Sequence, residues 1–209
     1  MKVVGIDEAG KGPVIGPMVV CGVLCDESDL PKLEKLGVKD SKKLKPERRK
    51  ELAEEIKKIC KICLIKVTPE EIDKSDNIND LLRESYIKII EKLNPDLVIV
   101  DSPDVKPERL KDFLENMTGR KVISKHKADE EFVIVAAASI VAKVERDVEI
   151  ERLKQEYGDF GSGYAGDPKT IKALREWIQS GKIPHIVRKR WRTVERLSQH
   201  SLDEFIEQE

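Results

Sequence analysis

The chain has 209 residues, of which 39% are hydrophobic and 38% are charged, and its formal net charge is −1. This length is enough for one large domain or for one domain with an appendage, and the near-neutral charge excludes a polycationic protein of the histone kind. A nucleic-acid surface must therefore be local, and the candidate is residues 182–196, where six Lys or Arg accompany one acid. The same residues also fit a solvated helix face whose acidic partners lie elsewhere.

The N-terminus has no features of a signal peptide, because its first residues form an apolar run that ends in acids. No apolar run approaches the ~20 residues that span a bilayer. We therefore expect a soluble, cytoplasmic protein.

Four cysteines suggest a zinc site, because Cys60 and Cys63 form a CxxC pair. Cys21 and Cys25, however, alternate with Val23 in an apolar run, which favours small buried side chains on one strand face. We therefore favour buried thiols over a zinc site, and a disulfide between the two segments stays an open alternative.

Five apolar runs, each bounded by Gly, Pro, Asp or Asn, have the composition of strands. They cover residues 2–7, 14–25, 62–67, 97–100 and 121–124. The first three follow one another around turns, which favours an antiparallel meander. The last two alternate with helical stretches, which favours parallel pairing.

Helical periodicity begins at Pro46, and it begins again after Asp76 or Asn77, either of which can cap the second helix. Further helices are predicted from Pro107 to Gly119 and over residues 129–157, 168–179 and 190–205. Strands and helices together predict an α/β fold with a mixed five-stranded sheet flanked by helices and a helical C-terminal portion.

Four acidic residues stand at the ends of predicted elements. Asp7 and Glu8 precede the turn Gly10–Gly12, Asp101 follows the strand 97–100, and Asp129 begins the long helix. In α/β sheets, functional side chains gather at strand ends and in the adjoining loops. Because neighbouring side chains on a strand point to opposite faces, Asp7 and Glu8 serve one site only if the strand ends between them.

Each acid alone also has a structural explanation, since Asp129 is a natural helix N-cap and Asp101 a turn former before a proline. Four grouped carboxylates would repel one another, and a pair of Mg²⁺ ions about 4 Å apart would remove that repulsion. Asp7 is the best candidate to bridge both ions, and the lack of a Cys/His set favours an oxygen-loving metal. The sequence thus predicts metal-dependent phosphate chemistry.

With these residues in place, the chain resembles the type 2 ribonucleases H, the ribonuclease HII family, in an archaeal form. The blocks that carry the resemblance keep their family order: GIDEAGKGPVIGP at 5–17, KDSKKL at 39–44, VDS at 100–102, HKAD at 126–129, ASIVAKVERD at 138–147 and GSGYAGDPKT at 161–170. Each block alone is weakly specific, whereas the ordered series covers most of the chain and is highly specific.

The resemblance implies a ribonuclease H-like catalytic domain over residues 1–160 and a helical portion over residues 161–209 that packs on it. It implies cleavage of the RNA strand of RNA/DNA hybrids, and cleavage at single ribonucleotides embedded in duplex DNA, by two-metal-ion hydrolysis that leaves 5′-phosphate and 3′-hydroxyl ends. Two ions, Mg²⁺ or Mn²⁺, would be held by the acids Asp7, Glu8, Asp101 and Asp129. A monomer is expected.

The resemblance also implies substrate contacts. The turn of Gly10, Lys11 and Gly12 matches the segment whose backbone reads the ribose 2′-hydroxyl, the group that separates RNA from DNA. Tyr164 matches the tyrosine that stacks under the sugar at the RNA–DNA junction, although an aromatic in a surface loop would look the same. The phosphate-contacting positions are matched by Ser41, Lys42, Lys43, Ser139 and Lys143, and these lysines also fit a solvated surface.

One departure from the family lies in the turn, where many members have arginine in place of Lys11. With lysine at this position, the backbone of the turn can still contact the ribose 2′-hydroxyl. The planar, forked contact of a guanidinium is lost, however, so the preference of the enzyme for an RNA–DNA junction stays open.

The C-terminal residues 199–206 are similar to the box that binds sliding clamps, with Gln199, Leu202, Phe205 and Ile206 at its positions. Ile206 stands where a second aromatic is usual. A one-turn apolar plug of this kind docks in a groove on the clamp. The same spacing equally describes a last helix that packs on its own domain.

Two alternatives to a type 2 ribonuclease H remain at this level. One is another nuclease or strand-transfer enzyme with the same acidic sheet, against which the Gly-Lys-Gly and Gly-Ser-Gly-Tyr blocks argue. The other is a non-catalytic hybrid- or DNA-binding module, against which the four intact acids argue.

Overall fold

The computed structural model describes residues 1–38 and 44–206, with side chains described as far as residue 199. The chain forms two compact units, each built from three segments. The first consists of Met1–Ala9, Val19–Lys66 and Asn77–Arg146, and the second of Gly10–Met18, Val67–Asp76 and Asp147–Glu209.

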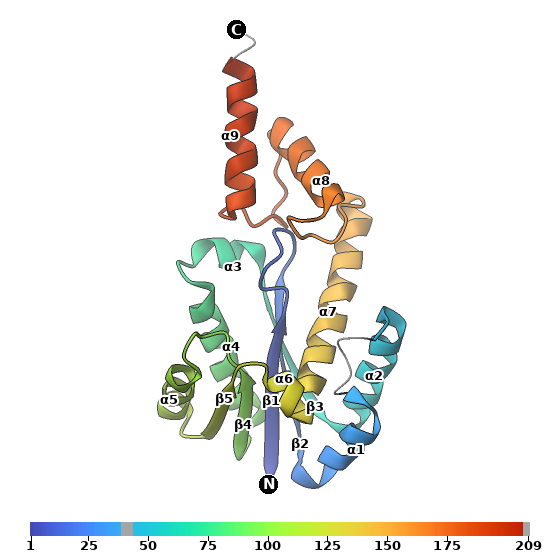
Figure 1. Ribbon diagram of the computed structural model, residues 1–209, viewed down its shortest axis with the longest axis vertical. Coiled ribbons are helices and arrows are strands. Elements are labelled where there is room, and N and C mark those ends of the chain that lie inside the picture. The colour runs from blue at the N-terminus through green and yellow to red at the C-terminus, as the bar shows by residue number, and fades with distance from the viewer. Residues whose placement is uncertain (39–43, 207–209) are drawn as a thin grey trace. The chain divides into compact units, whose positions relative to one another are not determined.

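The first unit contains a five-stranded sheet in the order β3-β2-β1-β4-β5. Its strands are β1 (Lys2–Ala9), β2 (Met18–Asp26), β3 (Lys61–Val67), β4 (Leu97–Asp101) and β5 (Lys121–Lys125). β1 pairs antiparallel with β2 and parallel with β4, and β4 pairs parallel with β5. The predicted mixed five-stranded sheet is therefore confirmed, and Figure 1 shows β1 at its centre.

Helices flank both faces of this sheet (Figure 1). They are α1 (Leu30–Lys35), α2 (Pro46–Ile59), α4 (Ile78–Leu93), α5 (Pro107–Thr118), α6 (Ala128–Glu131) and the first part of α7 (Val133–Tyr157), with a short 3₁₀ turn, η1, at Glu27–Asp29. The first turns of α7 are buried Val, Ile and Ala residues, and these small side chains let the helix backbone approach the central strand. Gly5 of β1 lies directly against Ile134 of α7.

The second unit holds α3 (Pro69–Lys74), the rest of α7, α8 (Pro168–Gln179) and α9 (Arg192–Ile206). Its core gathers Phe160 and Leu174 with Val187 and Val194. The segment that follows β1 joins this core, because Ile15 forms an antiparallel bridge with Val187. Two segments far apart in the sequence are thus tied together within the unit.

Local signals placed most helix ends correctly. Pro46 and Pro107 begin α2 and α5, and the Asn77 side chain caps α4 by accepting a hydrogen bond from the backbone N–H of Asn79 at 2.9 Å. Gly119 ends α5 in the left-handed conformation, with φ of 66°. Such ends are set by a few neighbouring residues, which is why the sequence shows them.

The larger differences from the prediction are one strand start, one divided helix and two short helices. β2 begins at Met18 rather than at residue 14, because Pro17 has no N–H to donate to a ladder. The helix expected over residues 129–157 is two helices, since Phe132 is extended between α6 and α7. α1 and α3, which have six residues each, are too short to show helical periodicity and were not predicted.

The cysteines are buried, as expected, and all four are free thiols. The Cys60 thiol donates a hydrogen bond to Cys25, and this contact lowers the pKa of Cys25. In the described part of the chain, no helix is both long and apolar enough to cross a membrane.

Candidate active site

Asp7 and Glu8 point to opposite faces of the sheet. The Glu8 carboxylate accepts a hydrogen bond from the Tyr86 hydroxyl of α4, with 3.1 Å between Oη and Oε2, whereas the Asp7 carboxylate is hydrogen-bonded to Ser139 of α7. β1 runs unbroken to Ala9, and yet the charge of Glu8 raises the pKa of Asp7, so the two carboxylates lie near each other without the strand ending between them, and the condition drawn from the sequence is wrong. The backbone N–H of Glu8 donates to Oδ1 of Asp7 at 2.7 Å, which fixes the Asp7 carboxylate against the backbone at the end of the strand.

Asp101 ends the strand next to β1, where the residues before the two acids, Ile6 and Val100, are paired, and its charge raises the pKa of Asp7. Its Oδ1 accepts a hydrogen bond from the backbone N–H of Ala128, at 3.3 Å. Asp129 follows Ala128 directly and is buried within α6. The N-cap explanation for Asp129 is wrong, because the N-cap of α6 is Lys127 in the left-handed conformation, with φ of 54°.

The pKa of Asp7 is raised well above its usual range. Burial is the largest cause, and the negative charges of Glu8 and Asp101 add to it. Hydrogen bonds from Ser139 and from the Glu8 backbone act in the opposite direction. The fold therefore holds a buried carboxyl among other acids, where a positive charge would relieve the repulsion.

Tyr86 is a site residue that sequence reasoning missed. It is fully buried, and burial together with the charge of Glu8 raises the pKa of its hydroxyl. In the sequence it is one of several apolar positions on the α4 face, so nothing marked it as different from its neighbours. The only available signal was that a buried tyrosine hydroxyl needs a hydrogen-bond partner.

Ser139 and Lys143, predicted to contact phosphate, lie one turn apart on α7. The Lys143 Nζ donates to Ser139 Oγ at 3.0 Å, and Ser139 in turn contacts Asp7. Ser139 is buried, whereas Lys143 is half-buried. A lysine at the edge of the site is thus linked through one hydroxyl to the buried acid, while contact of either residue with phosphate stays a prediction.

The donor chemistry of the cluster suits a hard divalent cation, because Asp7, Glu8, Asp101 and Asp129 all offer carboxylate oxygens. Within residues 1–38 and 44–199, whose side chains are described, no three His, Cys, Asp or Glu side chains are arranged as a ready metal site. Burial and then the negative charges of Glu8 and Asp101 raise the pKa of Asp7, and a bound cation would neutralise those charges. If ions bind, these four residues are the ones that would hold them.

The turn and Tyr164 lie together in the second unit. Gly10 has φ of 85°, a conformation that favours glycine, and a Cβ on Gly12 would stand 3.9 Å from Cε1 of Tyr164. The carbonyl of Gly163 accepts hydrogen bonds from the backbone N–H groups of Val14 at 2.8 Å and Ile15 at 3.2 Å, which joins the tyrosine loop to the segment after the turn. The Tyr164 side chain is 47% exposed and so presents its ring to solvent.

The basic run 182–196 is only partly a surface. Arg188 is completely buried and donates hydrogen bonds to backbone carbonyls of residues 10–16. Arg190 donates to the carbonyls of Asp73 and Ser75 instead. Two of the six basic side chains thus bind backbone carbonyls. Sequence reasoning missed this role, because within a basic run no local pattern distinguishes a buried arginine from its exposed neighbours.

The remaining predicted residues lie beyond these contacts. Ser41, Lys42 and Lys43 fall outside the described residues. The segment predicted to bind a clamp, residues 199–206, forms the end of α9, where Gln199 is exposed, and the side chains of Leu202, Phe205 and Ile206 fall outside the described part.

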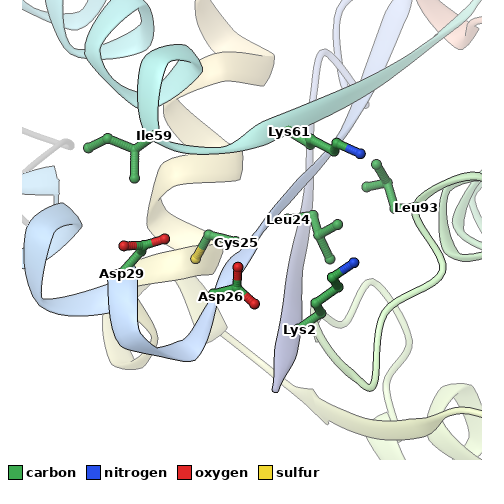
Figure 2. A pocket seen from close by; sticks show the side chains of 8 residues that line it. All are labelled: Lys2, Leu24, Cys25, Asp26, Asp29, Ile59, Lys61 and Leu93. Atoms are coloured by element: carbon green, nitrogen blue, oxygen red, sulfur yellow. The ribbon is translucent and has the colours of Figure 1, made fainter.

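A cavity of about 240 Å³ lies at the other end of the central strands (Figure 2). It is lined by Lys2, Leu24, Cys25, Asp26, Asp29, Ile59, Lys61 and Leu93. Lys2 is five residues from Asp7 on β1, or about 16 Å along a strand. The cavity is therefore separate from the acidic cluster.

The family model described as Ribonuclease HII matches residues 4–194. The chain belongs to the ribonuclease HII family. It is 59% identical to the ribonuclease HII of Archaeoglobus fulgidus over 204 residues, which cover 96% of this chain and 98% of that protein. As a member of this family it is a ribonuclease H enzyme, so the alternative of a non-catalytic binding module is wrong.

Solved structures agree with this assignment. Ribonuclease H2 from Pyrococcus horikoshii OT3 superposes with a TM-score of 0.92 at 43% identity, covering 97% of this chain and 99% of that one. The ribonuclease HII in a complex with PCNA from A. fulgidus gives 0.88 at 59% identity, covering 92% and 96%. The ribonuclease H-like fold predicted from the sequence is confirmed.

Proposed function

We propose that this member of the ribonuclease HII family cleaves the RNA strand of RNA/DNA hybrids and also cuts at single ribonucleotides embedded in duplex DNA. Its products would carry 5′-phosphate and 3′-hydroxyl ends. The observation that supports this proposal most directly is the buried Asp7 carboxyl, clustered with Glu8 and Asp101 at the end of the central strand. Clustered carboxylates of this kind suit metal-assisted phosphodiester hydrolysis.

In this proposal the carboxylates of Asp7, Glu8, Asp101 and Asp129 hold two Mg²⁺ or Mn²⁺ ions. Such ions, when bound, activate a water molecule and stabilise the leaving oxygen. The chain's own residues orient the acids: Tyr86 holds Glu8, Ser139 holds Asp7, and the Ala128 N–H holds Asp101. Preorganisation of this kind limits the movement that the site must make before reaction.

Ribose recognition is assigned to the turn of residues 10–12 and to Tyr164. The backbone of the turn would contact the 2′-hydroxyl, and the exposed Tyr164 ring would stack on the sugar beside the junction. Their proximity supports a shared role, because a Cβ on Gly12 would stand 3.9 Å from the Tyr164 ring.

Cleavage of duplex DNA with one embedded ribonucleotide tests this proposal. With Mg²⁺ or Mn²⁺, we expect the chain to cut at the ribonucleotide, and we expect Tyr164→Ala to lower kcat/KM on this substrate by roughly 10-fold or more through lost stacking. Tyr164→Phe, which keeps the ring, is the matched control and should remain near the parent. Equal cutting by Tyr164→Ala and the parent would remove Tyr164 from junction reading, and no metal-dependent cutting would overturn the proposed function.

We also propose that the tail binds a sliding clamp through Gln199, Leu202, Phe205 and Ile206. Support comes from the A. fulgidus relative, whose structure is a complex with PCNA, and from the motif spacing in this chain. An enzyme that removes ribonucleotides left in new DNA would benefit from such a partner.

The double variant Leu202→Ala/Phe205→Ala should weaken binding to archaeal PCNA by at least about 10-fold, because apolar anchors supply most of such affinity. Titration calorimetry measures the binding, and cleavage of a hybrid without clamp should stay at the parental rate. Asp203→Asn on the same helix is the control. If the parent shows no detectable binding to PCNA and the double variant misfolds, the two results together would instead support packing of the tail on its own unit.

A further inference from the structure

The residues that hold the turn come from a segment far along the chain. Nε of Arg188 donates to the carbonyl of Gly16 at 3.0 Å, Nη1 donates to the carbonyl of Lys11 at 2.8 Å, and Nη2 donates to the carbonyl of Gly10. Trp191 completes the set, since its Nε1 donates to the carbonyl of Gly12 at 3.1 Å. All three carbonyl oxygens of the turn therefore accept a hydrogen bond from one of these two side chains.

These two side chains also support each other. The guanidinium carbon of Arg188 stands 5.0 Å from the centre of the Trp191 ring, a cation–π contact. Arg188 is wholly buried, and its own backbone N–H donates to the carbonyl of Val14 at 2.8 Å. The planar, forked guanidinium serves three acceptors in one fixed geometry, which a lysine ammonium cannot match.

The direction of the carbonyls decides the direction of the amides. In a trans peptide the C=O and the N–H point in opposite directions, and the described chain has no cis peptide. The carbonyls of Gly10 and Lys11 point to Arg188, so the N–H groups of Lys11 and Gly12 point away from it. The turn is thereby held with two amide donors on one side and its carbonyls on the other.

We propose that Arg188 and Trp191 are positioning residues that set ribose discrimination, by fixing the turn so that the N–H groups of Lys11 and Gly12 are aimed at the 2′-hydroxyl. This inference rests on the proposed function, in which the turn reads the ribose. Donors fixed before binding lose little freedom on contact, and therefore they add more to selectivity than mobile donors do. Arg188 and Trp191 themselves touch no substrate in this scheme.

The test measures ribose preference in binding, separately from cleavage. In the inactive Asp7→Asn background, fluorescence anisotropy gives Kd for duplex DNA with one ribonucleotide and for the same all-DNA duplex, and the ratio of the two is the readout. Trp191→Phe keeps the ring over Arg188 and removes one hydrogen bond, so the ratio should fall by about 3- to 10-fold. Arg188→Lys should lower it by at least about 10-fold.

Arg190→Lys is the matched control, because Arg190 also donates to two backbone carbonyls, at 2.9 Å and 3.2 Å, but in the segment of Asp73 and Ser75. Its ratio should equal that of the background. If Arg188 and Trp191 had only a structural role, their variants would bind both duplexes more weakly by the same factor, and the ratio of the two Kd values would not change. The ratio would also stay unchanged if the turn needed no support. Either result overturns the inference. If Arg188→Lys does not fold by circular dichroism, Trp191→Phe decides. If the Asp7→Asn protein bound both duplexes with the same Kd, the proposed recognition of the ribose by the turn would itself be wrong.

Discussion

Replacing Asp7 with asparagine should abolish cleavage and, in metal-free buffer, make the protein more stable at neutral pH. The activity should fall on the order of 10³-fold or more, because the carboxylate that we propose to hold the metal ions loses its charge. Asparagine keeps the shape of the side chain and removes its charge. Steady-state cleavage of an RNA/DNA hybrid measures the loss, and turnover near the parental rate would contradict the role of Asp7.

The gain in stability follows from the direction of the pKa shift. Burial, Glu8 and Asp101 raise the pKa of Asp7 in the folded state above its unfolded value of about 3.9. The folded state is then favoured while the carboxyl is protonated, and this contribution is lost as the pH rises through the folded pKa. Above the unfolded pKa the Asp7 carboxyl therefore lowers the stability of the fold, and asparagine, which has no proton to lose, removes that penalty.

Thermal unfolding in EDTA between pH 4 and pH 8 measures this effect. The Tm difference between Asp7→Asn and the parent should be largest at neutral pH and should shrink toward pH 4. Asp112→Asn, which changes an exposed aspartate on α5, is the control and should show little difference at any pH. A variant less stable than the parent at pH 7 would show that the hydrogen bonds of Asp7 outweigh its burial.

Gly5→Ala should destabilise the first unit strongly, lowering the free energy of unfolding by about 3 kcal/mol. A Cβ at this position would lie 2.4 Å from the carbonyl carbon and oxygen of Ile134 and 2.7 Å from the backbone nitrogen of Val135. These are backbone atoms of α7, so the helix as a whole has to move away from β1. The same movement would part Asp7 from Ser139, so cleavage should fall as well.

Urea unfolding measures the change in free energy. Gly166→Ala is the control, because a Cβ there has no described heavy atom within 4 Å, and its effect should stay within about 0.5 kcal/mol. If Gly5→Ala were as stable as the parent, α7 would have to tolerate a shift away from the strand at no cost, and the close packing on β1 would be wrong.

Several features could be read from the sequence because a few neighbouring residues decide them. Pro46 begins a helix, Asn77 caps one, and Gly119 ends one, each through the conformation or hydrogen bonds of its own residue. Apolar runs between turn residues likewise located the strands. The N-cap assigned to Asp129 failed because Lys127, in a left-handed conformation, begins α6 instead.

Other features depend on contacts between distant residues. Arg188 meets the carbonyl of Lys11 across 177 positions of sequence, and no local pattern separates it from the exposed cations around it. Tyr86 looks like one more apolar position of α4 until the fold places Glu8 opposite its hydroxyl. Such contacts have no local signature.

The sequence by itself determined the chemistry available to this protein, namely four carboxylates at the ends of elements and a glycine turn after the first strand. Only the tertiary structure decided how these groups are used. It turns Asp7 toward α7 and Glu8 toward α4, and it places the turn of residues 10–12 in a different compact unit from the strand that precedes it. The physical reason is that residue types are local, whereas the face a side chain takes and the partner that holds it are set by long-range packing.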